Sequence, residues 1–335
     1  SQDNQFSFWS GPDGQEEWEL NNGALARIRV KGWQDITGLI FDLSGHRGKV
    51  VIDAELHLAK ADDLPIFSLV VSTINTDWHE SSASWRWRNN STSQEWTFSH
   101  SDFGTASFGN YGTLVSYGYK ASGTFSTYSS GGNTWVRMKL DPELVHALIM
   151  DQFGLAVTDP RGRNGNYNPR VYSKEQNSGV QPRLYLQFAS ELDVTPPGGA
   201  ADLTVEAGEE DGEVVLQFAA PNDPEDERAL GYTVRYSMTD DFGTASDVAR
   251  WRIPRPSVPG TMQRVLLENL VPGQNYHFFL QAYDKVGNPG PLSSGTLTLP
   301  EAAEIPVLAD GPFRVPDPEG RTVRTVDNVM RYWVC

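Results

Sequence analysis

The sequence predicts an all-β protein made of two β-sandwiches joined by a linker. Short runs of alternating apolar and polar residues, separated by Gly, Pro, Asn and Asp, recur along the 335 residues, whereas helical periodicity is scarce. The 31 Gly and 21 Pro fit a chain with many turns. A chain of this length is long enough for two domains, each of which can bury its own core.

The first module is expected over residues 1–190 as a jelly-roll sandwich of about eight strands. Alternation is clearest where Ala54, Leu56 and Leu58 face one way while Glu55 and His57 face the other, as a sheet with one buried face requires. The expected strands are Ala24–Val30, Ile36–Leu43, Val50–Leu58, Ile66–Ile74, Leu114–Tyr119, Thr134–Leu140, Phe153–Val157 and Arg183–Phe188.

One helix is expected to interrupt these strands, over residues 141–149. Asp141 is suited to be its N-cap, and Pro142 fits the first helical position. Leu144, Val145 and Leu148 fall on one apolar stripe, which predicts that the helix closes one end of the sandwich.

A linker is expected at residues 191–200, because Pro196-Pro197-Gly198-Gly199 breaks any periodic structure. Further on, Leu270 and Tyr276 are six residues apart across the turn Pro272-Gly273. This pattern resembles the tyrosine corner of β-sandwiches. Residues 201–300 are therefore similar to fibronectin type III domains throughout, with Phe218 where those domains usually carry Trp.

Residues 301–335 are predicted to be an extended connector, since prolines recur along them. The last five residues, Arg331-Tyr332-Trp333-Val334-Cys335, look like the start of a strand. A further domain is expected beyond Cys335, and the start at Ser1 suggests a processed or trimmed product.

Charge and cysteine content exclude several classes of protein. A net charge of −16 argues against a general nucleic-acid binder, which needs a basic surface. Residues 1–190 carry 16 Lys and Arg against 20 Asp and Glu, while residues 191–335 carry 11 against 23, so the second part is the acidic one. The single Cys335 excludes an intrachain disulfide, and no apolar run approaches the roughly 18 residues needed for a membrane span.

Four blocks of the first module carry a family resemblance. They are Gly38-Leu39-Ile40-Phe41-Asp42-Leu43-Ser44, Val50-Val51-Ile52-Asp53-Ala54-Glu55-Leu56-His57-Leu58, Trp78-His79-Glu80 followed by Ser84-Trp85, and Tyr172-Ser173-Lys174-Glu175 ahead of Gln181-Pro182-Arg183-Leu184. Most of residues 20–190 thereby resembles the DNRLRE-type carbohydrate-binding modules, family 96 of such modules. The resemblance implies a β-jelly roll that binds acidic polysaccharides such as alginate.

The first candidate ligand site is a cluster of aromatic and basic residues. Indole faces stack on the apolar faces of sugar rings, and arginine forks grip carboxylates or sulfates. The alternative interpretation places Trp85 and Trp87 in the core and the neighbouring arginines on a solvated face, because side chains two apart on a strand share a face. The cluster consists of Trp78, Trp85, Arg86, Trp87, Arg88 and Trp96.

A second candidate site surrounds the Gly- and Asn-rich loop 162–168, where an anionic glycan could bind at one end of the sandwich. Ordinary solvation of a loop is the alternative. If Trp85 and Trp87 are both buried, the predicted site shifts to this loop. Its residues are Arg161, Arg163, Tyr167, Arg170 and Lys174, with Arg183 and Tyr172 nearby.

No cofactor is expected, because the histidines show no metal-binding spacing. Asp and Asn oxygens between Asp159 and Asn168 could hold a structural calcium ion without matching an EF-hand. A lyase would need a Tyr or His base beside an Arg or Gln that neutralises a carboxylate, and a hydrolase would need paired carboxylates. Tyr172-Ser173-Lys174-Glu175-Gln176 has only a superficial likeness to such a site.

The sequence is therefore interpreted as a non-catalytic polysaccharide-binding module followed by a fibronectin type III spacer. Both would belong to a larger secreted or cell-surface protein, in which binding raises the local concentration of an attached enzyme on its substrate. Two alternatives remain: a structural or adhesive extracellular protein without sugar specificity, and a jelly-roll polysaccharide lyase.

Overall fold

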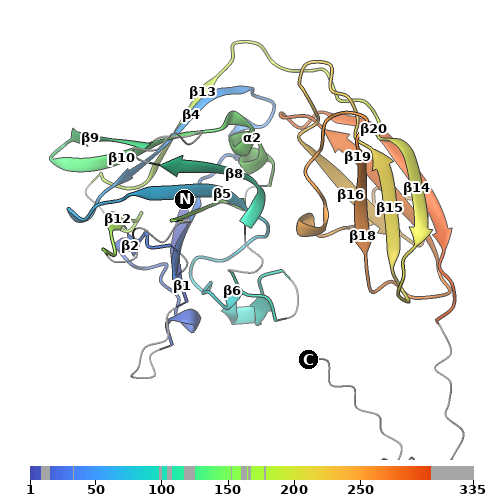
Figure 1. Cartoon of the computed structure of the whole chain (residues 1–335), viewed down its shortest axis with the longest axis horizontal. Helices are drawn as coiled ribbons and strands as arrows, with labels where there is room; N and C mark the ends of the chain where they lie inside the picture. The colour runs from blue at the N-terminus through green and yellow to red at the C-terminus, as the bar shows by residue number, and fades with distance from the viewer. Residues whose placement is uncertain are drawn as a thin grey trace, which may run out of the picture.

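The chain folds into two β-sandwiches in a computed structural model (Figure 1). The structure describes residues 1–8, 16–32, 34–97, 100–103, 108–116 (backbone only), 125–151, 153–159, 164, 167–176 and 179–302. The predicted all-β class is confirmed. The predicted connector 301–335 lies outside the described residues apart from its first two.

The first sandwich has two antiparallel sheets. The five-stranded sheet has the order β1 (Gln2–Ser7), β3 (Asp35–Ile40), β11 (Leu155–Thr158), β5 (Ser68–Ile74) and β8 (Phe108–Ser116). The four-stranded sheet has the order β13 (Arg183–Phe188), β4 (Val51–Ala59), β10 (Asn133–Leu140) and β9 (Phe125–Ser130). Two short ladders lie outside these sheets: β2 (Arg27–Arg29) with β12 (Arg170–Tyr172), and β6 (Trp87–Asn89) with β7 (Gln94–Glu95).

The core of the first sandwich lies between its two sheets. Leu56 and Leu58 of β4 are fully buried there, together with Leu69 of β5 and Leu155 of β11. Each such side chain removed from water contributes about 1.5–3 kcal/mol. The alternation predicted along β4 is confirmed, and it leaves the opposite face of this sheet free for polar and aromatic residues. The predicted jelly-roll connectivity stays a prediction.

Helix α2 (Pro142–Asp151) begins as the sequence predicts. The Asp141 carboxylate accepts a hydrogen bond from the Glu143 amide at 2.9 Å, which is an N-cap. Leu144, Val145 and Leu148 are buried in the core of the first sandwich. The helix lies between the two sandwiches, so its other side is turned toward the second one (Figure 1).

Strand β1 has no apolar alternation that a sequence pattern could detect. Its side chains are mostly polar, and five of its six residues are buried. The polar side chains of β1 form hydrogen bonds inside the protein. The side-chain amide of Gln5 donates to Ser7 Oγ at 2.7 Å and to Asp35 Oδ1 at 3.1 Å. The side-chain amide of Asn4 donates to the Ala83 carbonyl at 3.0 Å. A polar strand can be buried here because its polar groups find partners.

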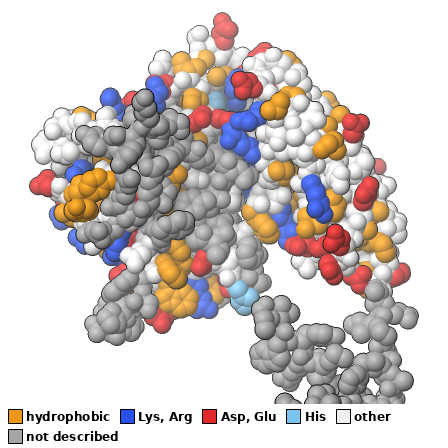
Figure 2. Space-filling model, viewed as in Figure 1, with side chains coloured by type: hydrophobic (Ala, Val, Ile, Leu, Met, Phe, Trp, Pro, Cys, Tyr) orange, Lys and Arg blue, Asp and Glu red, His pale blue; other side chains and the backbone are white. Residues whose placement is uncertain are grey.

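The second sandwich also has two antiparallel sheets. One has the order β14 (Ala201–Ala207), β15 (Val214–Ala219) and β18 (Met262–Leu267). The other has the order β17 (Ser246–Asp247), β16 (Gly231–Ser237), β19 (Asn275–Tyr283) and β20 (Pro289–Thr298). Phe218 is fully buried between them and meets Tyr232 edge to face at 5.0 Å, so an aromatic side chain fills this core without a Trp. On the face shown in Figure 2, Asp and Glu side chains gather at the lower end of this sandwich.

The predicted tyrosine corner is present. The Val271 amide donates a hydrogen bond to the Tyr276 hydroxyl at 3.0 Å, which ties the turn before β19 to that strand. Gly273 adopts a φ of +74° in this turn, a backbone conformation that favours glycine.

Removing the Tyr276 hydroxyl is expected to destabilise the second sandwich by about 1 kcal/mol, because Tyr276→Phe leaves the Val271 amide without its acceptor. Urea unfolding measures the change. Tyr236→Phe is the matched control, since its hydroxyl makes no hydrogen bond to the residues that the structure describes. Equal effects of the two substitutions would contradict a role for the corner.

The two sandwiches contact each other through α2. Glu143 is held by two arginines of the second sandwich: Arg228 reaches its carboxylate at 3.2 Å and 3.3 Å, and Arg255 pairs with the same group. Asp151 at the other end of the helix pairs with Arg250 at 3.3 Å. Burial opposes ionisation of Glu143, but hydrogen bonds from Arg255 and Arg228 outweigh it and lower the pKa of the carboxyl.

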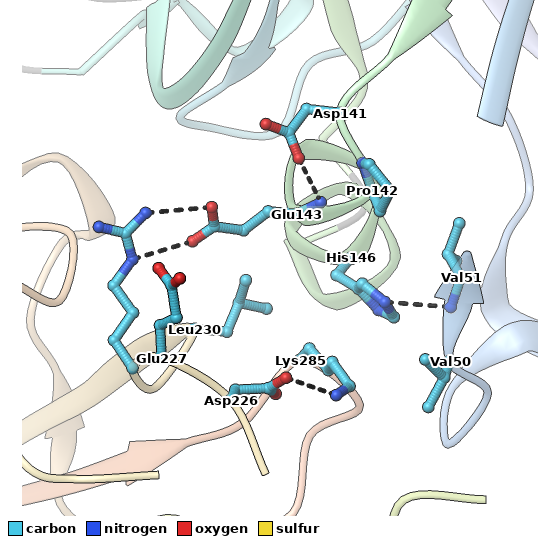
Figure 3. A pocket seen from close by; sticks show the side chains of 11 residues that line it. Val50, Val51, Asp141, Pro142, Glu143, His146, Asp226, Glu227, Leu230 and Lys285 are labelled. Carbon is cyan, nitrogen blue, oxygen red and sulfur yellow. Dashed lines mark hydrogen bonds and ion pairs between the residues drawn. The ribbon is translucent and has the colours of Figure 1, made fainter. Parts of the chain in front are cut away.

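A cavity of about 360 Å³ lies at this contact (Figure 3). Glu143 and His146 of α2 line it on one side, and Leu230 and Lys285 of the second sandwich line the other. His146 Nε2 accepts a hydrogen bond from the Val51 amide at 3.1 Å. Burial and the nearby Lys285 charge lower the pKa of His146 to about 4, so the imidazole is neutral at neutral pH.

Within the described part of the chain, no helix has the length and apolar character that crossing a membrane requires.

Candidate functional site

The structure places three of the predicted ligand-binding tryptophans inside the first sandwich. Trp78, Trp85 and Trp96 are only 4%, 5% and 1% exposed. They pack with Phe6 and Phe103 in an aromatic cluster, where Phe6 meets Trp78 and Trp96 edge to face at 5.3 Å and 5.1 Å. A buried indole cannot stack on a sugar, so the binding role expected for these three residues is corrected to a core role.

The remaining members of that cluster are partly exposed but engaged within the protein. The Arg86 guanidinium lies over the rings of Trp18 and Trp87, at 5.1 Å and 4.7 Å, and it pairs with Glu19 at 2.6 Å. Arg88 pairs with Asp77 at 2.6 Å. An anionic ligand would have to displace these carboxylates.

The predicted arginine loop is only partly described. Arg161 and Arg163 lie outside the described residues. Tyr167 is 45% exposed and packs beside Phe67 at 5.4 Å, and Arg170 is exposed. Lys174 does not face solvent freely, because it pairs with Glu80 at 3.1 Å and with Glu175.

The calcium site considered between Asp159 and Asn168 is not supported by the residues described there. Asp159 accepts hydrogen bonds from the Asn164 amide at 2.6 Å and from the Ser68 hydroxyl. The Asn164 side-chain oxygen accepts one from the Phe67 amide at 2.8 Å. These oxygens are engaged by protein donors, and they hold the loop against β5.

The structure brings together a different set of residues on the outer face of the four-stranded sheet, which we call the platform. Directly paired residues of antiparallel strands share a face. Tyr128 pairs with Trp135 and Ser126 with Arg137, while His57 pairs with both Arg137 and Arg183. The platform consists of Tyr128, Trp135, Arg137, His57, Glu55, Arg183 and Tyr185.

The aromatic part of the platform is ordered by stacking. The rings of Tyr128 and Trp135 are nearly parallel, with 14° between their planes, and the Arg183 guanidinium lies 4.5 Å from the Trp135 ring. Tyr185 is 47% exposed and lies beside His57, with ring centroids 4.6 Å apart. An exposed tyrosine of this size, fixed on a strand, offers a flat apolar surface.

The two platform arginines are exposed. Arg137 donates to the Ser126 hydroxyl at 3.2 Å, and Arg183 donates to the Tyr185 hydroxyl at 3.4 Å and to the Gly179 carbonyl. Among the described residues, no carboxylate pairs with either guanidinium. Arg86 and Arg88 are paired, so the platform differs from the predicted cluster in having charge available for an anion.

A line of polar groups crosses the platform beside these arginines. One ring nitrogen of His57 forms a hydrogen bond with the Tyr128 hydroxyl at 2.9 Å, and the other forms one with the Glu55 carboxylate at 2.9 Å. Burial raises the pKa of the Tyr128 hydroxyl, with Tyr185 adding to the shift, so this phenol stays protonated at neutral pH.

Of the platform residues, only Arg183 is predicted from the sequence to lie near a candidate site, because the platform is assembled from four strands. The alternation of Trp135, Arg137 and Lys139 with apolar residues signals a polar face on β10, and Arg183 and Tyr185 signal the same on β13. Which strands lie side by side depends on contacts between distant parts of the chain, and no local pattern carries that information.

Comparisons with known proteins bear on the second sandwich. Residues 195–296 match the model of the fibronectin type III domain family. Among solved structures, a crystal structure of FN3tt is 17% identical, with 32% of this chain and 100% of that chain covered and a TM-score of 0.24. The FN1–FN3 domains of chicken CNTN1 are 18% identical, with 53% of this chain and 55% of that chain covered and a TM-score of 0.26.

No curated protein matches the chain. The resemblance of the first module to family 96 carbohydrate-binding modules stays a prediction. The family match covers nearly all of β14 to β20, and the tyrosine corner lies within it. The second sandwich is therefore a fibronectin type III domain.

Proposed function

We propose that the first module binds an acidic polysaccharide on the platform and that the fibronectin type III domain holds this module in place within a larger extracellular protein. The observation that carries the proposal is the pair of exposed arginines, Arg137 and Arg183, beside the exposed ring of Tyr185; no carboxylate in the described part of the chain pairs with either guanidinium. No catalysis is assigned to these residues.

The chemistry of the platform suits an anionic sugar chain. Arginine forks bind carboxylates in a bidentate way, and an exposed tyrosine face stacks on the apolar side of a pyranose ring. Arg137 and Arg183 lie on opposite sides of β4, so their backbones are two strand spacings apart, roughly 10 Å. An extended polysaccharide that crosses the strands would meet both guanidinium groups and Tyr185.

The role of the second domain is to position the first. Binding of the platform to a polymer raises the effective concentration of whatever domain is attached, without any new contact to that domain. The acidic surface of the fibronectin type III domain repels an anionic polymer, which favours binding through the first module alone.

Affinity electrophoresis in gels containing alginate, pectin or ulvan tests this proposal, with a neutral polysaccharide as reference. The double substitution Arg137→Gln and Arg183→Gln is expected to weaken retardation at least about tenfold, which corresponds to about 1.4 kcal/mol. The matched control is Arg86→Gln with Arg88→Gln, which removes the same charge from the paired arginines and is expected to leave retardation unchanged.

Two results would contradict the proposal. Absence of retardation on every acidic polymer would favour the structural or adhesive alternative. Equal losses in the two double variants would show that overall charge, and not the platform, controls retention.

A second candidate function is a polysaccharide lyase, favoured by the position of His57 between Tyr128 and Glu55 and beside Arg137. A lyase abstracts a proton next to a uronate carboxylate, which needs a His or Tyr base and a group that neutralises the carboxylate. If the wild type produces the absorbance of unsaturated uronates from alginate and His57→Ala does not, the lyase function is established. Binding without such growth retains the non-catalytic proposal.

A further inference from the structure

Three carboxylates that do not belong to the platform meet on the first sandwich. Asp3 belongs to β1, Glu80 to the turn that follows β5, and Glu175 to the turn that follows β12. Each offers one oxygen, and these three oxygens lie within 4.8 Å of one another. Segments far apart in the sequence thus converge on one point.

The protein leaves this cluster short of positive charge. Among the residues that the structure describes, Lys174 is the one cation that pairs with it, at 3.1 Å from Glu80 and also with Glu175. Asp3 is only 2% exposed, yet its Oδ1 has no hydrogen-bond partner among the described residues, and the buried Glu175 Oε2 has none among them either. Buried carboxylate oxygens are stable when they are paired or coordinate a metal ion.

We propose that Asp3, Glu80 and Glu175 bind one calcium ion. Calcium takes six to eight oxygen ligands at about 2.3–2.6 Å, so ligands on opposite sides of the ion are roughly 5 Å apart, and the cluster fits that span. The oxygen-only donor set favours a hard cation over a transition metal. Three carboxylates balanced by one lysine leave a net charge of −2, which a divalent ion neutralises.

The ligands are already held in place by the backbone. The Asp3 amide donates to Glu80 Oε1 at 2.6 Å, and the Lys174 amide donates to Asp3 Oδ2 at 2.5 Å. These bonds orient two of the three carboxylates before an ion arrives. A bound ion would fasten the polar strand β1, which has little apolar surface of its own, to two turns of the same sandwich.

The test is a calorimetric titration of the full chain with CaCl2 after treatment with a chelator. Burial, together with Glu175 and Glu80, raises the pKa of Asp3 to about 7, so the titration is done at about pH 8, where this carboxyl has lost its proton. One calcium per chain is expected. Asp3→Asn and Glu175→Gln are each expected to weaken binding at least about tenfold, because affinity follows the charge of the ligands.

Asp77→Asn is the matched control, since it removes a carboxylate that is 61% exposed and paired with Arg88, and it is expected to leave calcium binding unchanged. Without calcium, Asp3→Asn and Glu175→Gln are expected to melt cooperatively and no earlier than the wild type, because each relieves repulsion within the cluster. No heat from the wild type at millimolar calcium, or undiminished binding by Asp3→Asn, overturns the proposal. Equal binding of MgCl2 would overturn the assignment to calcium.

Discussion

The substitution Glu143→Ala is expected to separate the two domains and to lower the free energy of unfolding by about 2 kcal/mol. Its side chain carries the main ionic contact between them, since Arg228 and Arg255 both bind its carboxylate. Breaking a buried ion pair costs about 3–5 kcal/mol, whereas exposed pairs contribute about 0–1 kcal/mol. Glu143 and Arg228 are 27% and 32% exposed, which places the expected effect between these limits.

Loss of Glu143 also removes the carboxylate that both the Arg228 and the Arg255 guanidinium groups contact. Their repulsion is expected to open the contact around the cavity that Glu143 lines (Figure 3). Differential scanning calorimetry is then expected to show two separate transitions for the variant and one coupled transition for the wild type, and small-angle X-ray scattering is expected to give a larger radius of gyration for the variant.

The control is Asp247→Ala, which removes a carboxylate that pairs with Arg235 at 2.6 Å inside the second domain. Asp247 is 69% exposed, so little loss of stability is expected and the domain arrangement should persist. If Glu143→Ala leaves both the calorimetric profile and the scattering unchanged, the arginine contacts do not hold the domains together.

Local patterns predicted the elements whose structure is decided locally. Alternation along β4 identified its buried face, and the Asp141 and Pro142 pair located the start of α2 within one residue. The tyrosine corner was recognisable because its two residues lie on either side of a single turn. In each case the residues that determine the structure are within a few positions of one another.

The candidate site could not be predicted in this way, because its residues meet only through tertiary contacts. The period of two in Trp85-Arg86-Trp87-Arg88 predicts that both tryptophans share a buried face, but only Trp85 is buried, and Trp87 is partly exposed like the two arginines. That Trp85 lies in the core depends on Phe103 and on Phe8 near the start of the chain. Arg183 likewise covers Trp135, 48 positions earlier in the sequence, and only the sheet order brings them together.

The contact between the domains could not be predicted from local sequence patterns either. Glu143 was expected only as part of a helix that closes the first sandwich, and that expectation accounts for one side of α2. Its partner Arg228 is 85 residues away in another domain. Charges on the solvent side of a predicted helix do not reveal whether water or another domain faces them.

Acidification is expected to destabilise the contact between the domains through His146. The pKa of this imidazole is lowered from 6.5 to about 4, chiefly by burial and then by the Lys285 charge. The folded state therefore binds the proton less readily than the unfolded chain does. The stability that the neutral ring contributes is fully present above pH 6.5 and is lost as the pH falls toward 4. A shift of this size corresponds to about 3 kcal/mol.

The hydrogen bond to His146 is a second, independent reason to expect that protonation of this ring destabilises the fold. His146 Nε2 accepts the Val51 amide, so a proton on that nitrogen would place two donors against each other. The charged groups nearest to the ring are Lys285 and Asp226, which pair with each other at 2.6 Å. A protonated imidazole would add a second positive charge beside Lys285 in the cavity.

His146→Gln provides the measurement, because its side-chain oxygen can accept the Val51 amide but does not titrate. Urea unfolding at about pH 7 and about pH 4 gives, at each pH, the free energy of unfolding of the wild type minus that of the variant. This difference is expected to fall by about 3 kcal/mol from pH 7 to pH 4. The comparison with the variant is needed because Asp3 has the opposite effect on stability. The raised pKa of Asp3 makes the fold more stable as the pH falls through 7 toward 3.8. That contribution is common to both proteins and cancels. If the two proteins keep the same difference at both pH values, His146 is not the group that makes the domain contact sensitive to acid.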